Sequence, residues 1–106
     1  ELAISAASLT ELHFGVMVTA DSAVRAERLR RLSILQRTFD PLPVDHDVAT
    51  SYGRLAAAVA GIGRQPRSRV FDLLIAATAH AHDARLYTRN AADLAGLDDL
   101  VEIVPI

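Results

Sequence analysis

Hydrophobic residues along this chain recur with the spacing of an amphipathic helix in several segments that carry capping signals. Ser8 is placed to cap a helix that begins near Leu9, and Asp21 with Ser22 can cap the next one. Helices are predicted from about residue 9, over 23–39, from Asp45 or Asp47 to Gly61, over 68–82 and over 90–97. The chain is therefore predicted to be rich in helix.

Shorter runs between these helices have the character of strands: residues 2–5, 40–44, 85–88 and 101–106. Pro41 and Pro43 make 40–44 an edge strand, because proline cannot donate a ladder hydrogen bond. Short strands separated by helices predict βαβ units with right-handed crossovers and a mainly parallel sheet. We therefore expect one α/β domain over residues 1–106, with a three-layer α/β/α arrangement.

Composition limits the kinds of function open to this chain. Apolar residues make up 51% and charged residues 23%, the balance of a globular fold with a buried core. The net charge of −2 does not favour nucleic-acid binding through the overall field, so such binding would need a local basic patch. The absence of cysteine excludes thiol nucleophiles, thiolate metal sites and disulfides, and it favours the cytoplasm. No apolar run reaches the roughly twenty residues of a membrane span, so we expect a cytoplasmic protein.

Asp72 is the most informative residue of the sequence. It lies in a helical segment, residues 70–79, that is apolar nearly all the way round and should be mostly buried. A buried carboxylate must be hydrogen-bonded, paired or bound to a cation, because burying it alone is costly. One explanation is structural: the helix dipole and an ion pair with Arg69 would stabilise an acid in the first turn. The other is that Asp72 binds a cation in a functional site.

Glu11 and Asp93 each follow a predicted strand by a few residues, and both also have a structural explanation. Ser8 and Glu11 match the capping box S/T-x-x-E, in which Glu11 would accept the backbone N–H of Ser8. Asn90 can cap the helix of residues 90–97 and place Asp93 at its third position. Taken singly, neither acid decides between capping and catalysis.

The placement of the three acids favours a metal site. In an open parallel sheet, groups beyond the carboxyl ends of the strands converge on one crevice, which would bring Glu11 and Asp93 near Asp72. Clustered carboxylates repel one another unless a divalent cation lies among them, and hard oxygen ligands select Mg²⁺ or Mn²⁺. Such a pocket suits phosphodiester hydrolysis, because one ion lowers the pKa of a water nucleophile and a second stabilises the leaving oxygen.

A basic segment precedes Asp72. Arg64, Arg67 and Arg69 lie there in close succession, where they could hold RNA phosphates at the rim of the pocket. A solvated loop is an equal alternative, so the segment by itself does not establish RNA binding.

The sequence contains TELHFGV at residues 10–16, FDLLIAATA at 71–79 and TRNAADL at 88–94. In order and spacing these segments resemble the hallmark segments of PIN-domain VapC toxins, most closely the FitB-like branch. The resemblance covers essentially the whole chain. It implies a PIN-like fold and a metal-dependent endoribonuclease that pairs with a VapB-type antitoxin and usually forms a homodimer. The site residues that it implies are the metal-binding acids Glu11, Asp72 and Asp93, with Asn90 beside the site and Thr88 or Arg89 as support.

The sequence departs from this family at its start. The family's first acid ends an N-terminal strand in a V-D-T/S segment, and no residue here corresponds to it. The resemblance implies that a strand and a helix, about thirty residues by the usual length of such a unit, are missing before Glu1. We expect the missing strand to be central, between residues 2–5 and 85–88. Its place would be filled by a separate or cleaved polypeptide, or by an element swapped from a partner chain.

Two other functions are open at this point. An inactive or truncated PIN module would serve only to bind antitoxin or a second copy of itself. A receiver-like α/β domain would accept a phosphoryl group in an acidic Mg²⁺ pocket, but this sequence has no lysine to hold the phosphoryl oxygens. The metal-dependent endoribonuclease is therefore the leading hypothesis.

Overall fold

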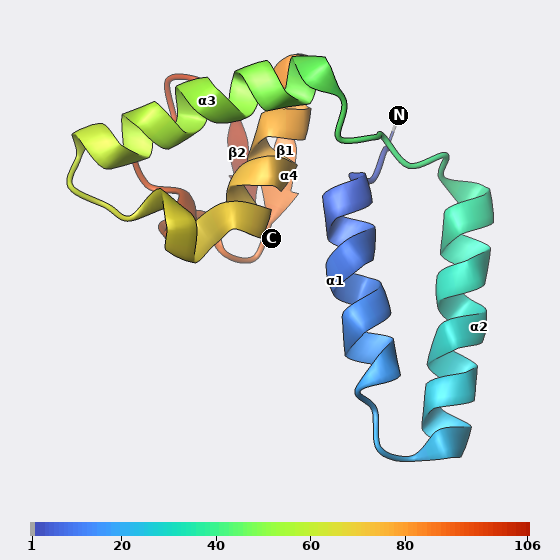
Figure 1. The fold of residues 1–106 in the computed structure, drawn as a ribbon. Helices are drawn as coiled ribbons and strands as arrows, with labels where there is room; N and C mark the ends of the chain where they lie inside the picture. Colours follow the sequence, from blue (N-terminus) through green and yellow to red (C-terminus); the bar gives the residue numbers. More distant parts are fainter. Residues whose placement is uncertain (1) are drawn as a thin grey trace. The chain divides into compact units, whose positions relative to one another are not determined.

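The computed structural model describes residues 2–106 (Figure 1). Within these residues, a polar side chain caps the start of each of the first three α-helices. The chain divides into two compact units, Glu1–Pro43 and Val44–Ile106. The first unit contains α1 (Ala6–Met17) and α2 (Ser22–Thr38), and all other elements belong to the second.

The first unit is a pair of helices that lie side by side (Figure 1). As predicted, α2 begins after Asp21, whose carboxylate accepts the backbone N–H groups of Ala23 and Val24 at 2.9 and 3.0 Å. The two helices meet through a few buried residues: Leu9, Val16 and Leu32. Several other large apolar side chains of both helices stay exposed, so the core of this unit is small.

The start of α1 differs from the prediction. Ser5 is its N-cap, because the Ser5 hydroxyl accepts the N–H of Ala7 at 3.1 Å and the Ser5 carbonyl accepts that of Leu9 at 3.2 Å. The backbone of Ser5 is extended, with φ −78° and ψ 144°, whereas the residues after it are helical. Ser8 therefore lies inside the helix, and its prediction as the cap is wrong.

The strands predicted at residues 2–5 and 40–44 are reduced to one parallel bridge, between Ser5 and Leu42. The N–H of Ala6 donates to the Leu42 carbonyl at 2.8 Å. The pairing ends there because α1 starts at Ala6, and the next backbone groups enter the helix. These segments are therefore extended and joined at one point rather than forming a ladder.

The second unit combines helices with a short sheet. Its elements are α3 (His46–Gly61), the 3₁₀ turn η1 (Pro66–Arg69), α4 (Val70–Ala81), β1 (Leu86–Thr88), the 3₁₀ turn η2 (Ala91–Leu94) and β2 (Ile103–Pro105). β1 and β2 pair in parallel, with Leu86 opposite Ile103 and Thr88 opposite Pro105. The strands predicted at 85–88 and 101–106 are thus present in shortened form. The predicted α/β class with a parallel sheet is confirmed.

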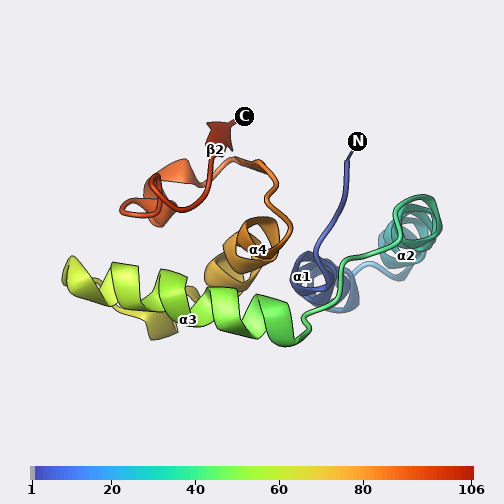
Figure 2. The same ribbon diagram turned by 90° about the horizontal axis from the view of Figure 1, so that it is seen from above.

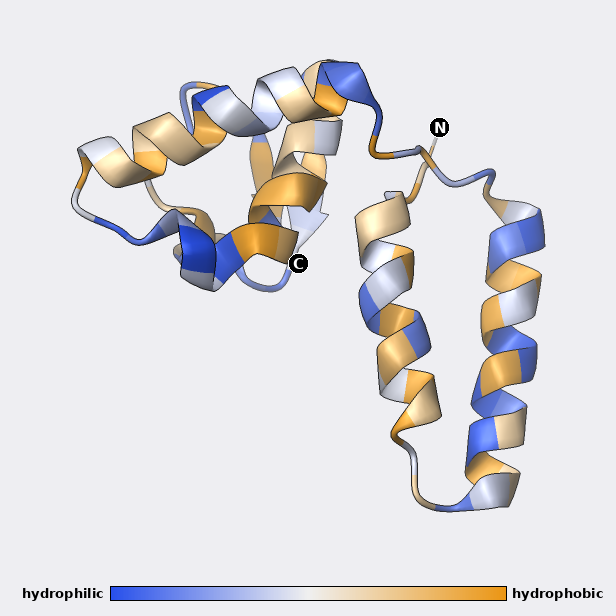
Figure 3. Cartoon of the chain, viewed as in Figure 1, coloured by the Kyte–Doolittle hydropathy of each residue, from blue (hydrophilic) through white to orange (hydrophobic). Residues whose placement is uncertain are grey.

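α4 lies between α3 and the strands, as Figure 2 shows, and this position explains its almost unbroken apolar sequence (Figure 3). Leu73, Ala76 and Ala77 are fully buried and pack with α3 residues and with Leu86 of β1. The small alanine side chains allow the neighbouring elements to approach closely on both sides. Even so, no helix within residues 2–106 is long and apolar enough to span a membrane.

The helices predicted over 68–82 and 90–97 are shorter than their sequence patterns suggest. The first opens as the 3₁₀ turn η1, and regular α-helix begins only at Val70. The second is reduced to the turn η2, because Ala95 returns to extended backbone with ψ 138° and Gly96 adopts φ +94°. Helix boundaries in this unit therefore depend on local backbone conformation rather than on apolar spacing.

The cap of α3 is Asp45 rather than Asp47, because the Asp45 carboxylate accepts the N–H of Val48 at 3.0 Å. We expect Asp45→Ala to lower the free energy of unfolding by about 1 kcal/mol through loss of this bond. Asp47→Ala removes only a first-turn charge and should change it by less than about 0.5 kcal/mol. Urea unfolding followed by circular dichroism measures both variants. Equal effects would show that Asp45 does not cap the helix.

Candidate functional site

Asp72 lies in the first turn of α4 and is half-buried. Arg69, the expected partner of Asp72, pairs with another acid instead. The Nη1 atom of Arg69 lies 2.9 Å from Oδ1 of Asp93. Within residues 2–106 the Asp72 carboxylate makes no hydrogen bond or ion pair. The structural explanation by an Arg69 pair is therefore wrong for Asp72. Among the described residues, the helix dipole and solvent are what stabilises this charge, and the Asp72 oxygens are available to a cation.

Asp93 lies in η2, and two arginines hold this turn against the start of α4. Nη1 of Arg69 also donates to the Asp93 carbonyl at 3.0 Å, and Nη1 of Arg64 donates to the same carbonyl at 3.3 Å. The ion pair is partly shielded, since the Arg69 side chain is 25% exposed. Arg64 and Arg69 thus have structural roles that the sequence did not reveal. Arg67 is exposed and makes no such contact among the described residues.

The segment between β1 and η2 carries the remaining predicted site residues. The Thr88 hydroxyl accepts the N–H of Asn90 at 3.0 Å, which shapes the chain as it leaves the strand. Asn90 is the N-cap residue of η2 and Asp93 is its third residue, as expected, but the Asn90 side chain makes no capping hydrogen bond. Asn90 and Arg89 are both exposed and lie between Thr88 and Asp93 along the chain. Their side chains are therefore free to take part in a site.

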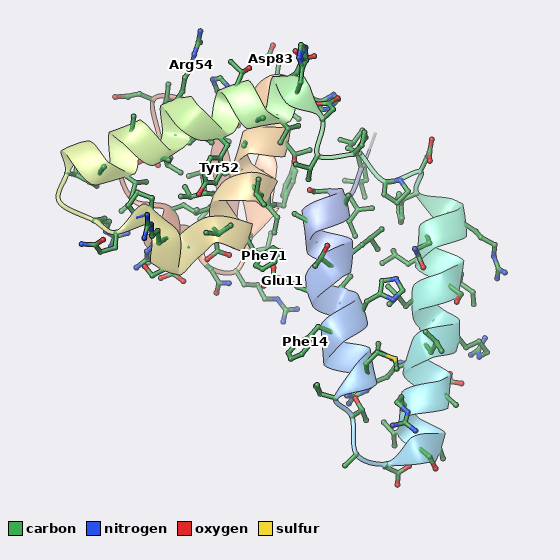
Figure 4. The ribbon with its side chains drawn as sticks, in the orientation of Figure 1. Glu11, Phe14, Tyr52, Arg54, Phe71 and Asp83 are labelled. Carbon is green, nitrogen blue, oxygen red and sulfur yellow. The ribbon has the colours of Figure 1, made fainter. Side chains whose placement is uncertain are left out.

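Glu11 projects from α1 of the first unit (Figure 4). Because Ser5 caps α1, Glu11 lies beyond the first turn, and the capping-box explanation is wrong. Its exposed carboxylate has no hydrogen bond or ion pair within the described residues. No three acidic, histidine or cysteine side chains of residues 2–106 are grouped so that they could hold a metal ion. Of the three acids, the structure pairs Asp93 with Arg69, and the convergence of all three stays a prediction.

A groove of about 500 Å³ lies between α1 and α2 of the first unit. Its floor is mainly apolar, and its charged residues are Glu11 on α1 with Arg28 and Arg31 on α2. Arg31 also pairs with Glu27 at 3.3 Å. The hydrogen bond from Arg30 is the main cause of the lowered pKa of that Glu27 carboxyl. The groove therefore combines an apolar floor with a basic edge.

A polar contact inside the second unit was missed by sequence reasoning. Oγ of Ser51, a buried residue of α3, lies 2.7 Å from Nδ1 of His80 on α4. Ser51 follows Val48 by three residues and precedes Leu55 by four, and this helical spacing on the buried face was the available signal. His80 also lines a polar pocket of about 260 Å³ that contains Asp83. This pocket is at the C-terminal end of α4, away from Asp72, so the contact joins two helices rather than adding to the site.

Comparison with known proteins matches the PIN-domain profile to residues 1–99. The chain belongs to the PIN-domain family. It is 36% identical over 107 residues to "Ribonuclease VapC5" of Mycobacterium tuberculosis, a match over 99% of this chain and 76% of that protein. The structure of VapBC-5, a toxin–antitoxin system of the same organism, superposes with a TM-score of 0.84 at 36% identity, over 98% of this chain and 81% of that one.

The PIN-domain chain is also similar to FitAcB from Neisseria gonorrhoeae, with a TM-score of 0.83 and 26% identity over 95% of this chain and 72% of that one. The predicted assignment to VapC-type PIN domains is confirmed. The closer relation to the FitB-like branch stays a prediction.

If Asp72 is a metal ligand, added metal should change the melting temperature of the protein more than removal of the carboxylate does in the absence of metal. In EDTA we expect the melting temperature of Asp72→Asn to stay close to that of the wild type, because no partner is lost. Mn²⁺ should raise the wild-type melting temperature by mass action, equivalent to about 2.7 kcal/mol at a hundred times the dissociation constant, and raise the variant far less.

Asp99→Asn is the control for this experiment, since Asp99 is an exposed acid that is not among the proposed ligands. It should retain the full Mn²⁺ response in differential scanning calorimetry. An unchanged Mn²⁺ response in Asp72→Asn would exclude Asp72 as a ligand.

Proposed function

We propose that this PIN-domain chain is a metal-dependent endoribonuclease toxin of a type II toxin–antitoxin system. The observation that carries the proposal is Asp72, a half-buried carboxylate at the start of an apolar helix that has no partner among residues 2–106. Burying a carboxylate without a partner costs free energy, and binding a cation offsets this cost. The similarity to proteins named as VapC ribonucleases indicates the class of reaction, which is RNA cleavage.

The chemistry of the available ligands fits Mg²⁺ or Mn²⁺. Both ions prefer carboxylate, amide and water oxygens, and Asp72, Asp93, Glu11 and the Asn90 side chain offer such atoms. Asp93 would share its oxygens between the ion and Arg69, which lies 2.9 Å away. A bound ion supplies an activated water and charge stabilisation for phosphodiester hydrolysis. These four residues are therefore our proposed metal set.

The arginines around this site would bind the RNA backbone. Arg67 and Arg89 are exposed and have no ion pair within the described part of the chain, whereas Arg64 and Arg69 contact η2 and offer only their remaining N–H groups. Guanidinium groups match the geometry of phosphate oxygens and position a strand without reading its sequence. Thr88 supports the turn that carries Arg89. An RNA substrate places this activity in the cytoplasm.

Asp72→Asn should abolish RNA cleavage with little effect on the fold, since it keeps the size of the side chain but removes its charge. The loss should be at least about a hundredfold in initial rate, measured on single-stranded RNA with Mn²⁺ and with EDTA as a blank. Asp83→Asn is the matched control, because Asp83 is exposed in the same unit and Asn tolerates its φ of +52°. Wild-type rates in Asp72→Asn would refute the nuclease assignment.

A VapB-type antitoxin is the partner that we propose for the groove between α1 and α2. The groove offers the apolar surface and basic edge that suit an amphipathic segment with acidic residues. It is also open, since Leu12 on its floor is 43% exposed. Homodimerisation, which the family relation favours, would cover further exposed apolar residues. A catalytically inactive module would keep this binding, so the groove alone does not distinguish it from the enzyme.

Leu12→Asp should weaken binding of the VapB-type antitoxin by at least about tenfold, because it places a charge on a surface that becomes buried. Leu29→Asp is the control: Leu29 is a leucine of α2 with 40% exposure that does not line the groove. Isothermal titration calorimetry compares both variants with the wild type. Equal losses in the two variants would place the antitoxin elsewhere.

A further inference from the structure

Phe71 stands immediately before Asp72, in the first turn of α4, and is 42% exposed. Its ring projects from the N-terminal end of the helix (Figure 4). The residue on the other side of Asp72, Leu73, is fully buried in the core. Burial of α4 therefore accounts for Leu73, whereas it does not account for the exposed part of the Phe71 side chain.

The residues around Phe71 suggest what its ring contacts. Arg67 lies four residues before it in the sequence, is exposed and has no partner among residues 2–106, and the N-terminal end of a helix itself favours anions. An exposed aromatic ring in the first turn of a helix that follows an exposed arginine is complementary to a nucleotide, whose base is apolar on its faces and whose phosphate is anionic. Unpaired bases stack on exposed aromatic rings of proteins, and each such contact is worth about 1–3 kcal/mol.

We propose that Phe71 is a stacking platform for an unpaired base of the RNA substrate, next to the proposed metal-binding carboxylate of Asp72. This rests on the proposed ribonuclease function and adds a determinant of specificity to it. A phenyl ring has no hydrogen-bonding groups, so it accepts any base that is free of a duplex. Phe71 thus selects single-stranded over double-stranded RNA and contributes to substrate binding rather than to the chemical step.

Binding can be followed at this position directly, because the chain contains no tryptophan. In Phe71→Trp the new indole should be quenched when single-stranded oligoadenylate binds, and much less by an RNA duplex of equal length. Phe14→Trp, at a 69% exposed position of the first unit, should show no quenching. Anisotropy of fluorescently labelled oligoadenylate measures binding independently of the tryptophan.

Oligoadenylate that binds by anisotropy without quenching Phe71→Trp would overturn the stacking proposal and leave the ribonuclease function intact. RNA that neither binds nor is cut by any form of the protein would overturn both.

Kinetics separate stacking from simple packing. Phe71→Ala should raise KM for single-stranded RNA by about 5- to 100-fold, the equivalent of one stacked base, and leave kcat within about twofold. Phe71→Tyr should behave as the wild type. Phe71→Leu keeps an apolar side chain of similar size and should show the defect of Phe71→Ala. Full activity in Phe71→Leu would show that any apolar side chain suffices and would overturn the proposal, even if the alanine variant folds poorly.

Discussion

The burial of α4 is the constraint on which the second unit depends. Because α4 lies between α3 and the strands, nearly every side of it must be small or apolar, and Ala76 and Ala77 meet this requirement without exposed surface. A charged residue can be accommodated only near an end of such a helix, where water and the helix dipole stabilise it. Asp72 occupies this position. The packing of the core thereby restricts where the site can form.

The ion pair between Arg69 and Asp93 determines which acid at this end of α4 has a positively charged partner. Arg64 and Arg69, which precede Asp72 in the sequence, both contact Asp93 of η2. This arrangement pairs Asp93 and leaves Asp72 without an ionic partner among residues 2–106. The divalent cation that we propose would compete with Arg69 for Asp93 but not for Asp72. The same contact thus stabilises the turn and is compatible with the proposed role of Asp72 as a metal ligand.

The first unit is organised differently. Its two helices share a small buried core, and many of its apolar side chains remain in contact with solvent. Their exposure carries a cost in free energy that is recovered when a partner covers them. An apolar groove with a basic edge is therefore consistent with a unit whose exposed apolar surface is buried when a partner binds. The second unit, in contrast, completes its own core and carries Asp72, Asp93 and most of the polar residues of the proposed site.

The sequence by itself determined the order of the elements and the parallel pairing of the strands near residues 86 and 103, and it singled out Asp72 as a candidate site residue. Each depends on local spacing: helical periodicity, short apolar runs between turns, and one acid in an apolar segment.

The sequence did not determine which serine caps α1, which acid Arg69 pairs with, or that Ser51 contacts His80. Ser5 and Ser8 are equally good caps in isolation, and only the bridge to Leu42 keeps Ser5 extended. Arg69 is as near in sequence to Asp72 as an ion pair requires, yet η2 packs against α4 and brings Asp93 within 2.9 Å. These outcomes depend on contacts between residues far apart in the chain, which only the tertiary structure decides.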